Sequence, residues 1–300
     1  MDKQSDRSAP RFSSPAHHAL AGLWRHAGLP AEALSWADLP GADPVLPSSF
    51  AVATAAQASL GAAALAAAEL WQLRTGRRQR VQVPREHAAL ECCGHFTLNG
   101  QALNPWDKLS GLYACGADAG EPGWVRIHAN FAHHRDGALA LLGCPTGPTT
   151  ERVAVAQALR RWRAVDFETA AADAGLVVSA ARSFDDWDRH PQALALAGQP
   201  TVSIERIGTA GPAPWPALAA GTRPLQGLRV LDLTRILAGP VAGRTLAAYG
   251  ADVMLVNSPN LPNSEAIAET RRGKLSAHLD LRTAAGRDSL QALVREAHVF

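Results

Sequence analysis

The sequence predicts an α/β protein with a parallel βαβ unit at its C-terminal end, preceded by a smaller α+β domain. Two short apolar runs, Leu228–Leu233 and Ala251–Val256, are typical of strands buried on both faces of a sheet. Between them, Val241–Tyr249 follows Pro240 and precedes Gly250, as expected of a helix with a proline in its first turn and a glycine after its end. A strand, a helix and a strand within about thirty residues form a right-handed unit, so we expect the two strands to be parallel.

The carboxyl ends of these strands are where a ligand should bind. They fall at Thr234–Gly239 and Asn257–Pro262. A dinucleotide site would carry G-x-G-x-x-G in the first turn and an acidic residue after the second strand. The chain has Gly239-Pro240 and Asn257 at those places, so an NAD-dependent enzyme is the weaker alternative.

The smaller domain contains the most apolar stretch of the chain, Phe50–Leu73. It carries no charge from Phe50 to Ala68 and is long enough to suggest a membrane span. Alanine, its main residue, drives membrane insertion only weakly, so we expect a buried, closely packed helix. Gly76 should end this helix, and Arg80–Val83 should begin an extended segment.

Four segments follow one another along the chain in this prediction. Residues 1–20 are a disordered polar tail without the apolar core of a secretory signal. Residues 21–207 form the smaller domain, residues 208–223 a linker rich in Pro, Gly and Ala, and residues 224–300 the start of the βαβ domain. The further strands and helices are expected at Gly123–Asn130, Leu176–Ala180, Val202–Ile207, Ala132–Gly143, Thr150–Arg163, Phe167–Ala174, Ser183–His190 and Asp288–Ala297.

Composition argues against several classes of function. The chain has 29 Lys and Arg against 27 Asp and Glu, so non-specific attraction to nucleic acid or to a membrane is not expected. Its four cysteines form no C-x-x-C motif, and free thiols suit a reducing cytoplasm. His128, His133 and His134 are the densest histidine group, but no carboxylate or thiol stands at ligand spacing, so no metal site is expected.

Three spaced blocks near the C-terminus carry a resemblance to a known family. They read L-D-L-T-R-x-L-A-G-P, L-A-x-x-G-A-D-V and R-G-K-x-S-x-x-L-D-L-R, in that order. This pattern resembles the start of a family III CoA-transferase, a family that includes formyl-CoA:oxalate and carnitine CoA-transferases and α-methylacyl-CoA racemase. The resemblance implies a Rossmann-like domain that holds coenzyme A (CoA). It also implies an enzyme that moves CoA between carboxylic acids through an acyl anhydride on an Asp.

The resemblance further implies which residues contact CoA. The first turn, the residue after the second strand and the third block would lie against it: Ile236, Leu237, Ala238, Ser258, Leu279, Asp280, Leu281 and Arg282. Arg271, Arg272, Lys274 and Arg282 would pair with its phosphates, since guanidinium and ammonium groups bind phosphate well. The alternative for residues 271–274 is a solvated basic turn. CoA or acyl-CoA is then a substrate, and no permanently bound cofactor is expected.

The Ala-rich helix resembles a later part of the same family. There the helix begins near a catalytic Asp and ends in R-T-G-R-G-Q, which Leu73–Gln79 resembles here. Counting back from Arg74, the Asp position falls on Thr54, whose hydroxyl would need an activating base. Residues 50–207 thus resemble the back half of one family member and residues 224–300 the front of another. We expect a tandem arrangement in which the first copy is degenerate.

The end of the chain bears on the expected activity. His298–Phe300 resembles the opening of a third strand, and a sheet that stopped there would leave an apolar edge. We therefore expect a truncated chain, inactive alone, whose catalytic Asp lies beyond Phe300. A non-catalytic CoA-binding or assembly subunit and an acyl-CoA racemase or isomerase stay open as alternatives. Because the family's members are interlocked dimers, we expect a cytoplasmic homodimer that acts on acyl-CoA and carboxylic acids, without nucleic acid or membrane.

Overall fold

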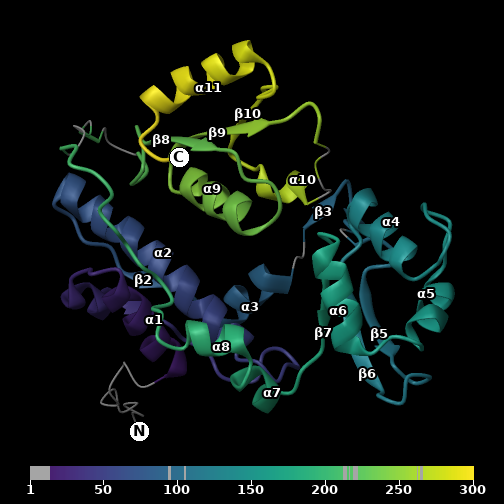
Figure 1. Cartoon of the computed structure of the whole chain (residues 1–300). Coiled ribbons are helices and arrows are strands. Elements are labelled where there is room, and N and C mark those ends of the chain that lie inside the picture. The colour runs from purple at the N-terminus through teal and green to yellow at the C-terminus, as the bar shows by residue number, and fades with distance from the viewer. Residues whose placement is uncertain are drawn as a thin grey trace, which may run out of the picture. The chain divides into compact units, whose positions relative to one another are not determined.

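The computed structural model describes residues 14–93, 96–104, 106–211, 215, 217–218, 222–261, 263 and 266–300 (Figure 1). The chain divides into two compact units, Met1–Leu103 with Pro200–Phe300, and Asn104–Gln199. This grouping differs from the expected boundary at residue 207, because the Ala-rich helix shares a unit with the βαβ segment. Most of the expected N-terminal tail, several linker positions and Pro262 lie outside the described residues.

The first unit begins with a helix where the sequence predicts a tail. Helix α1 (Pro15–His26) starts after Ser14, whose side chain accepts a hydrogen bond from the His17 amide. Ala16, Leu20 and Trp24 recur every four residues and form one buried face of the helix. The prediction of a disordered tail is therefore wrong from Pro15 onwards.

The expected Ala-rich helix is confirmed as α2 (Val52–Thr75). Gly76 follows it with a φ of 73°, and its amide donates to the Gln72 carbonyl. A side chain at Gly61 would lie 3.1 Å from Leu39 Cδ2, so the alanines and glycine allow very close packing. In the part of the chain that the structure describes, no helix is long and apolar enough to cross a membrane.

Short elements surround α2 in the same unit. The 3₁₀ helix η1 (Ala31–Trp36) leads into β1 (Ala37–Asp38), which pairs in parallel with β2 (Val81–Gln82), the expected extended segment. Helix α3 is Arg85–Cys93, and the hairpin strands β3 and β4 are Thr97–Leu98 and Gln101–Ala102.

The C-terminal part of the first unit contains a parallel sheet. Its strands are β8 (Arg229–Asp232), β9 (Asp252–Asn257) and β10 (Leu275–His278), in the order β10-β9-β8. Helix α9 (Ala238–Ala248) joins β8 to β9, which confirms the α/β class and the parallel βαβ unit. After α10 (Ile267–Thr270), β10 and α11 (Ala284–Glu296), Val299 makes a parallel bridge to Val230. Figure 1 shows α9 and α11 on opposite sides of this sheet.

The C-terminal residues differ in one respect from the expectation. The third strand is β10, and Val299 lies on the other side of β8, where its carbonyl accepts from the Leu231 amide. Strand β10 has largely exposed side chains, so no apolar run reveals it in the sequence. Its pairing with β9 defines it as a strand.

The second unit is an antiparallel sheet with helices. Strands β5 (Gly111–Cys115), β6 (Gly123–Ile127) and β7 (Val178–Ala180) lie in the order β5-β6-β7, which confirms two expected strands. Its core buries Val125, Ile127, Leu139 and Phe167. The helices are α4 (Ala132–Leu141), α5 (Arg152–Leu159), α6 (Ala164–Asp173), α7 (Phe184–Asp188) and α8 (Pro191–Leu196).

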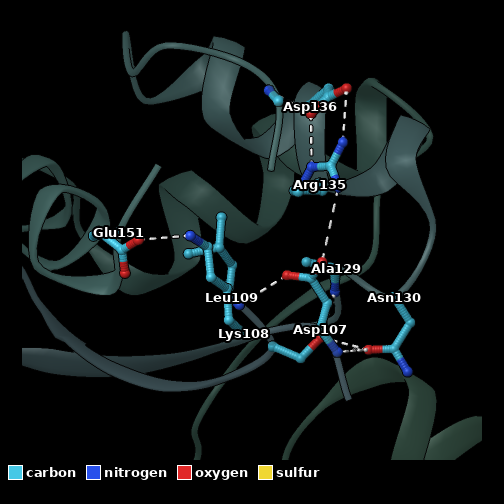
Figure 2. A network of polar contacts seen from close by, with 10 residues as sticks. Asp107, Lys108, Leu109, Ala129, Asn130, Arg135, Asp136 and Glu151 are labelled. Atoms are coloured by element: carbon cyan, nitrogen blue, oxygen red, sulfur yellow. Dashed lines mark hydrogen bonds and ion pairs between the residues drawn. The ribbon is translucent and has the colours of Figure 1, made fainter. Parts of the chain in front are cut away.

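A polar network ties the loop before β5 to α4 (Figure 2). Arg135 Nε donates to Asp136 at 2.8 Å, and its guanidinium lies 3.9 Å from Asp107. The Asp107 amide donates to Asn130 Oδ1 at 3.1 Å, and Asp107 Oδ1 accepts from the Leu109 amide at 2.8 Å. Because both carboxylates face one guanidinium, this network fixes the loop and does not resemble an acid–base pair.

The prediction of a strand at Val202–Ile207 is wrong. These residues form no strand, and Ile204 and Ile207 are 73% and 94% exposed. Their β-branched side chains favour an extended backbone, but a strand also needs a paired neighbour.

Candidate functional site

A hollow lies at the carboxyl edge of the parallel sheet. It has a volume of about 130 Å³. It is lined by Leu233, Arg235, Val256, Asn257, Ser258, Leu261, Asn263, Leu279 and Leu281. The lining residues end β9 or follow β8, β9 and β10, the place where parallel sheets bind their ligands.

The sequence predicts part of this lining. Ser258, Leu279 and Leu281 are expected site residues that line the hollow together. Leu233 and Arg235 are lining residues that the prediction missed, although both lie in or beside the turn after β8 where it expected the ligand. The strand-end rule gives the signal for them, because it marks the whole turn and not only its last residues.

Polar side chains at the hollow hold the strand ends together. The buried amide of Asn257 donates to Ser276 Oγ at 2.9 Å and to the Ala277 carbonyl at 3.4 Å. Ser258 Oγ accepts from the Asn260 amide at 3.2 Å. The hollow therefore combines an aliphatic wall with a rim of fixed amide and hydroxyl groups.

Arg282 lies in the turn after β10 and pairs with Asp280. Its guanidinium makes two hydrogen bonds of 3.0 Å to the carboxylate, while its side chain is 71% exposed. These bonds, together with one from the Arg282 amide, hold the pKa of Asp280 well below its usual range. The carboxylate thus stays charged and orients a guanidinium that solvent can reach.

Lys274 is not exposed, contrary to the expectation that it binds phosphate. Its side chain is fully buried, and Nζ lies 2.8 Å from Asp232 Oδ2 and 2.8 Å from the Pro240 carbonyl. A buried ammonium held by two protein acceptors does not reach a phosphate. The structure therefore places Lys274 in a structural ion pair.

The remaining predicted residues are exposed. Arg271 and Arg272 follow α10, and Arg272 lies 3.7 Å from Glu269 and over the Phe96 ring. Ile236, Leu237 and Ala238 form the turn into α9 and do not line the hollow itself.

Thr54, at the position that the family resemblance assigns to the nucleophile, lies in the first turns of α2. Its Oγ1 accepts a hydrogen bond of 2.7 Å from Arg85 Nη2. The buried Arg85 also donates to Asp43 at 2.7 Å and to Gln57 Oε1 at 3.1 Å. A cavity of about 300 Å³ adjoins Asp43, Thr54 and Arg85. A hydroxyl bonded to a guanidinium is not activated by a base, so the arrangement does not favour nucleophilic attack.

A larger hollow of about 860 Å³ lies between α1, α2 and the end of α3. Its lining includes Leu23, Phe50, Val52 and Ala55 and is almost wholly apolar. Such a wall offers few partners to a phosphate group, so the smaller hollow at the sheet edge is the better candidate for a phosphorylated ligand.

The histidine group is in the second unit. The His133 and His134 rings lie 4.1 Å apart, and burial, with His133 and His128 nearby, lowers the pKa of His134. Within the described ranges, no group of three or more His, Cys, Asp or Glu side chains is arranged to hold a metal ion.

Comparison with known proteins matches residues 225–300 to the family model CoA-transferase family III. An acyl-CoA transferase from Gibberella moniliformis is 31% identical over 196 residues, which are 61% of this chain and 34% of that protein. A formyl-CoA:oxalate CoA-transferase from Escherichia coli is 34% identical over 90 residues, 26% of this chain and 22% of that protein. A crystal structure of a CAIB/BAIF family protein from Brucella suis is 40% identical and covers 26% of this chain and 25% of that one, with a TM-score of 0.24. The chain thus spans 34% or less of the length of these curated relatives.

Proposed function

We propose that this chain, whose residues 225–300 match the family model CoA-transferase family III, is the CoA-binding part of an enzyme that moves CoA between carboxylic acids. One observation carries the proposal. Ser258, Leu279 and Leu281, which the motif resemblance assigns to CoA, come from two turns of the chain, those after β9 and after β10, yet line one hollow at the sheet edge.

The topology of the sheet supports a Rossmann-like domain in this proposal. With Val299 beyond β8, the chain orders its strands as β10-β9-β8-Val299. Numbered along the chain, this is the order 3-2-1-4 that begins a doubly wound nucleotide-binding fold. CoA is a nucleotide with phosphate groups, so the aliphatic wall would take its apolar parts and Arg282 a phosphate.

The chemistry of the intact protein is part of the same proposal. An Asp carboxylate attacks the thioester carbonyl carbon, the carbon–sulfur bond breaks, and CoA leaves as a thiolate. The acyl group stays on the Asp as a mixed anhydride, and the CoA thiolate attacks the Asp carbonyl carbon of that anhydride, which releases the first acid and leaves CoA on the Asp as a thioester. The carboxylate of the second acid attacks this thioester and releases the CoA thiolate, which then attacks the carbonyl carbon of the second acid in the new anhydride and regenerates the Asp carboxylate. Thr54 does not supply this carboxylate, so the proposal places the nucleophile downstream of Phe300. The proposal also makes the intact protein a cytoplasmic homodimer.

A second candidate is a non-catalytic CoA-binding or assembly subunit. The hydrogen bond from Arg85 to Thr54 favours it, because the nucleophile position of the first copy is then part of a structural network. An acyl-exchange assay on the gene product that extends past Phe300 separates the two. Exchange between acyl-CoA and a free acid supports the enzyme, and CoA binding without exchange supports the subunit.

Calorimetry with CoA tests the proposal on the chain of 300 residues. We expect micromolar affinity that Arg282→Ala weakens by about tenfold, because a charge-assisted hydrogen bond to phosphate is lost. Arg295→Ala, which removes an exposed arginine from α11, is the matched control and should bind as the wild type does. A folded chain that does not bind CoA would contradict the proposal.

A further inference from the structure

A fully buried ion pair joins two of the sequence blocks that carry the family resemblance. Asp232 ends β8 and Lys274 directly precedes β10, and their side chains are 3% and 0% exposed. Lys274 Nζ donates to Asp232 Oδ2 and to the Pro240 carbonyl of α9, each at 2.8 Å. The pair therefore links a strand, a helix and the start of a second strand.

The other carboxylate oxygen of Asp232 holds the turn after β8. Oδ1 accepts from the Thr234 amide at 2.9 Å and from the Thr234 hydroxyl. Between them, Asp232 and Lys274 thus bond both ends of the segment from Thr234 to Pro240. This segment contains Arg235, which lines the hollow, and it follows Leu233, which lines it too.

Helix α9 packs directly on this network through its glycines. A Cβ at Gly243 would lie 2.4 Å from Asp232 Oδ2 and 2.9 Å from Lys274 Nζ. A Cβ at Gly239 would lie 2.2 Å from Thr234 Cγ2. The helix comes this close only because both positions lack a side chain, so the network and the helix fix each other's place.

The buried pair specifies geometry more than it adds stability. Taking two charges out of water is costly, and apolar residues of the same volume often stabilise a fold as well. Apolar residues would not bond the Pro240 carbonyl or the Thr234 amide, so only the polar network sets the path of the turn between them.

We propose that Lys274 is a positioning residue, which through Asp232 and Pro240 holds the turn after β8 in the shape that receives CoA. This inference rests on the proposed function. Lys274 does not touch CoA, so its loss lowers the affinity for CoA by loosening the turn.

Thr234 offers a test that leaves the buried pair itself in place, because Thr234 is an exposed residue at the edge of the network. Thr234→Val removes the hydroxyl that bonds Asp232, and Thr234→Ser keeps it. We expect the valine variant to bind CoA about three- to tenfold more weakly and the serine variant to bind as the wild type does. Amide hydrogen exchange in residues 233–241 should be faster in the valine variant alone, with or without CoA.

The pair itself is tested by neutralising both partners together. Lys274→Met alone leaves a buried unpaired carboxylate and endangers the fold. The double variant Asp232→Asn with Lys274→Met removes both charges, and we expect it to fold with a CoA affinity at least about tenfold lower. If the double variant does not fold, the comparison of Thr234→Val with Thr234→Ser tests the positioning role.

The outcomes separate this inference from the proposed function. A wild-type chain that binds CoA, with Thr234→Val and the folded double variant binding equally well, would overturn the positioning role and leave the function standing. A folded wild-type chain that does not bind CoA overturns the proposed function. Hydrogen exchange in the turn is then the only measurement that tests the positioning role of Lys274. Unchanged exchange in Thr234→Val overturns the positioning role in that case too.

Discussion

Arg85 is the residue around which the N-terminal end of α2 is arranged. Its buried guanidinium bonds Asp43, Thr54 and Gln57, and the Gln57 amide in turn donates to the Pro40 and Val83 carbonyls. The network joins α2 to the loops before it and after β2. It includes Thr54, the position to which the family resemblance assigns a nucleophile.

Removing this guanidinium should destabilise the first unit. We expect Arg85→Ala to lower the free energy of unfolding by about 2–4 kcal/mol, because Gln57 and Thr54 lose a buried donor and the arginine stem leaves a void. Urea denaturation measures the change. Arg77→Ala, at an exposed position after the same helix, is the control and should cost under about 0.5 kcal/mol. Equal effects of the two changes would contradict the structural role of Arg85.

The Asp280–Arg282 pair makes a prediction about pH. Because Arg282 lowers the pKa of Asp280, the pair is fully formed above the ordinary carboxyl pKa of about 3.9 and is lost as the pH falls through the lowered value. An NMR titration of the Asp280 carboxyl carbon should show this low pKa in the wild type. In Arg282→Ala it should move up towards the ordinary value, and a pKa that does not move would show that the guanidinium is not its cause.

At the scale of the elements, the close approach of α9 to the sheet depends on Gly243. We expect Gly243→Ala to lower the free energy of unfolding by about 2 kcal/mol or more, since the new methyl group pushes on Asp232 and Lys274. The same change at Gly22 of α1, where a Cβ meets nothing within 4 Å, should raise stability by about 0.5–1 kcal/mol. Thermal unfolding of both variants should therefore shift in opposite directions, and a stabilising Gly243→Ala would contradict the packing described.

Local sequence patterns predict the elements that bury a continuous face. The apolar runs of β8 and β9, the small residues of α9 and the alanines of α2 each show their period or length in the sequence. Strand β10 was missed because its exposed residues alternate weakly and its pairing with β9 is a long-range property. The prediction of a strand at Val202–Ile207 failed for the opposite reason, because these residues have a strand-like pattern but pair with no neighbouring strand in the structure.

The candidate site was predictable in its position but not in the roles of its residues. The strand-end rule located the turns, and Ser258, Leu279 and Leu281 do line the hollow. A sequence does not show that Lys274 is buried, because lysine is almost always exposed unless it is paired. Its partner Asp232 lies far away in sequence, so only the fold reveals the pair.

For the whole molecule, the division into two units groups the segments differently from the sequence-based prediction. The Ala-rich helix and the parallel sheet share one unit, while the antiparallel sheet forms the other. Within the first unit, Arg74 donates to the Pro224 and Gln226 carbonyls, and Arg244 pairs with Glu91 and Glu269. These contacts tie α2 and α3 to the segment that the family match covers.

The most direct test of the account is hydrogen-exchange mass spectrometry of the wild-type chain with and without CoA. If the hollow at the sheet edge is the site, CoA should slow exchange in the three turns that contain Leu233, Ser258 and Leu281. Protection confined to the apolar hollow around Leu23 and Ala55, or no protection in a chain saturated with CoA, would contradict it.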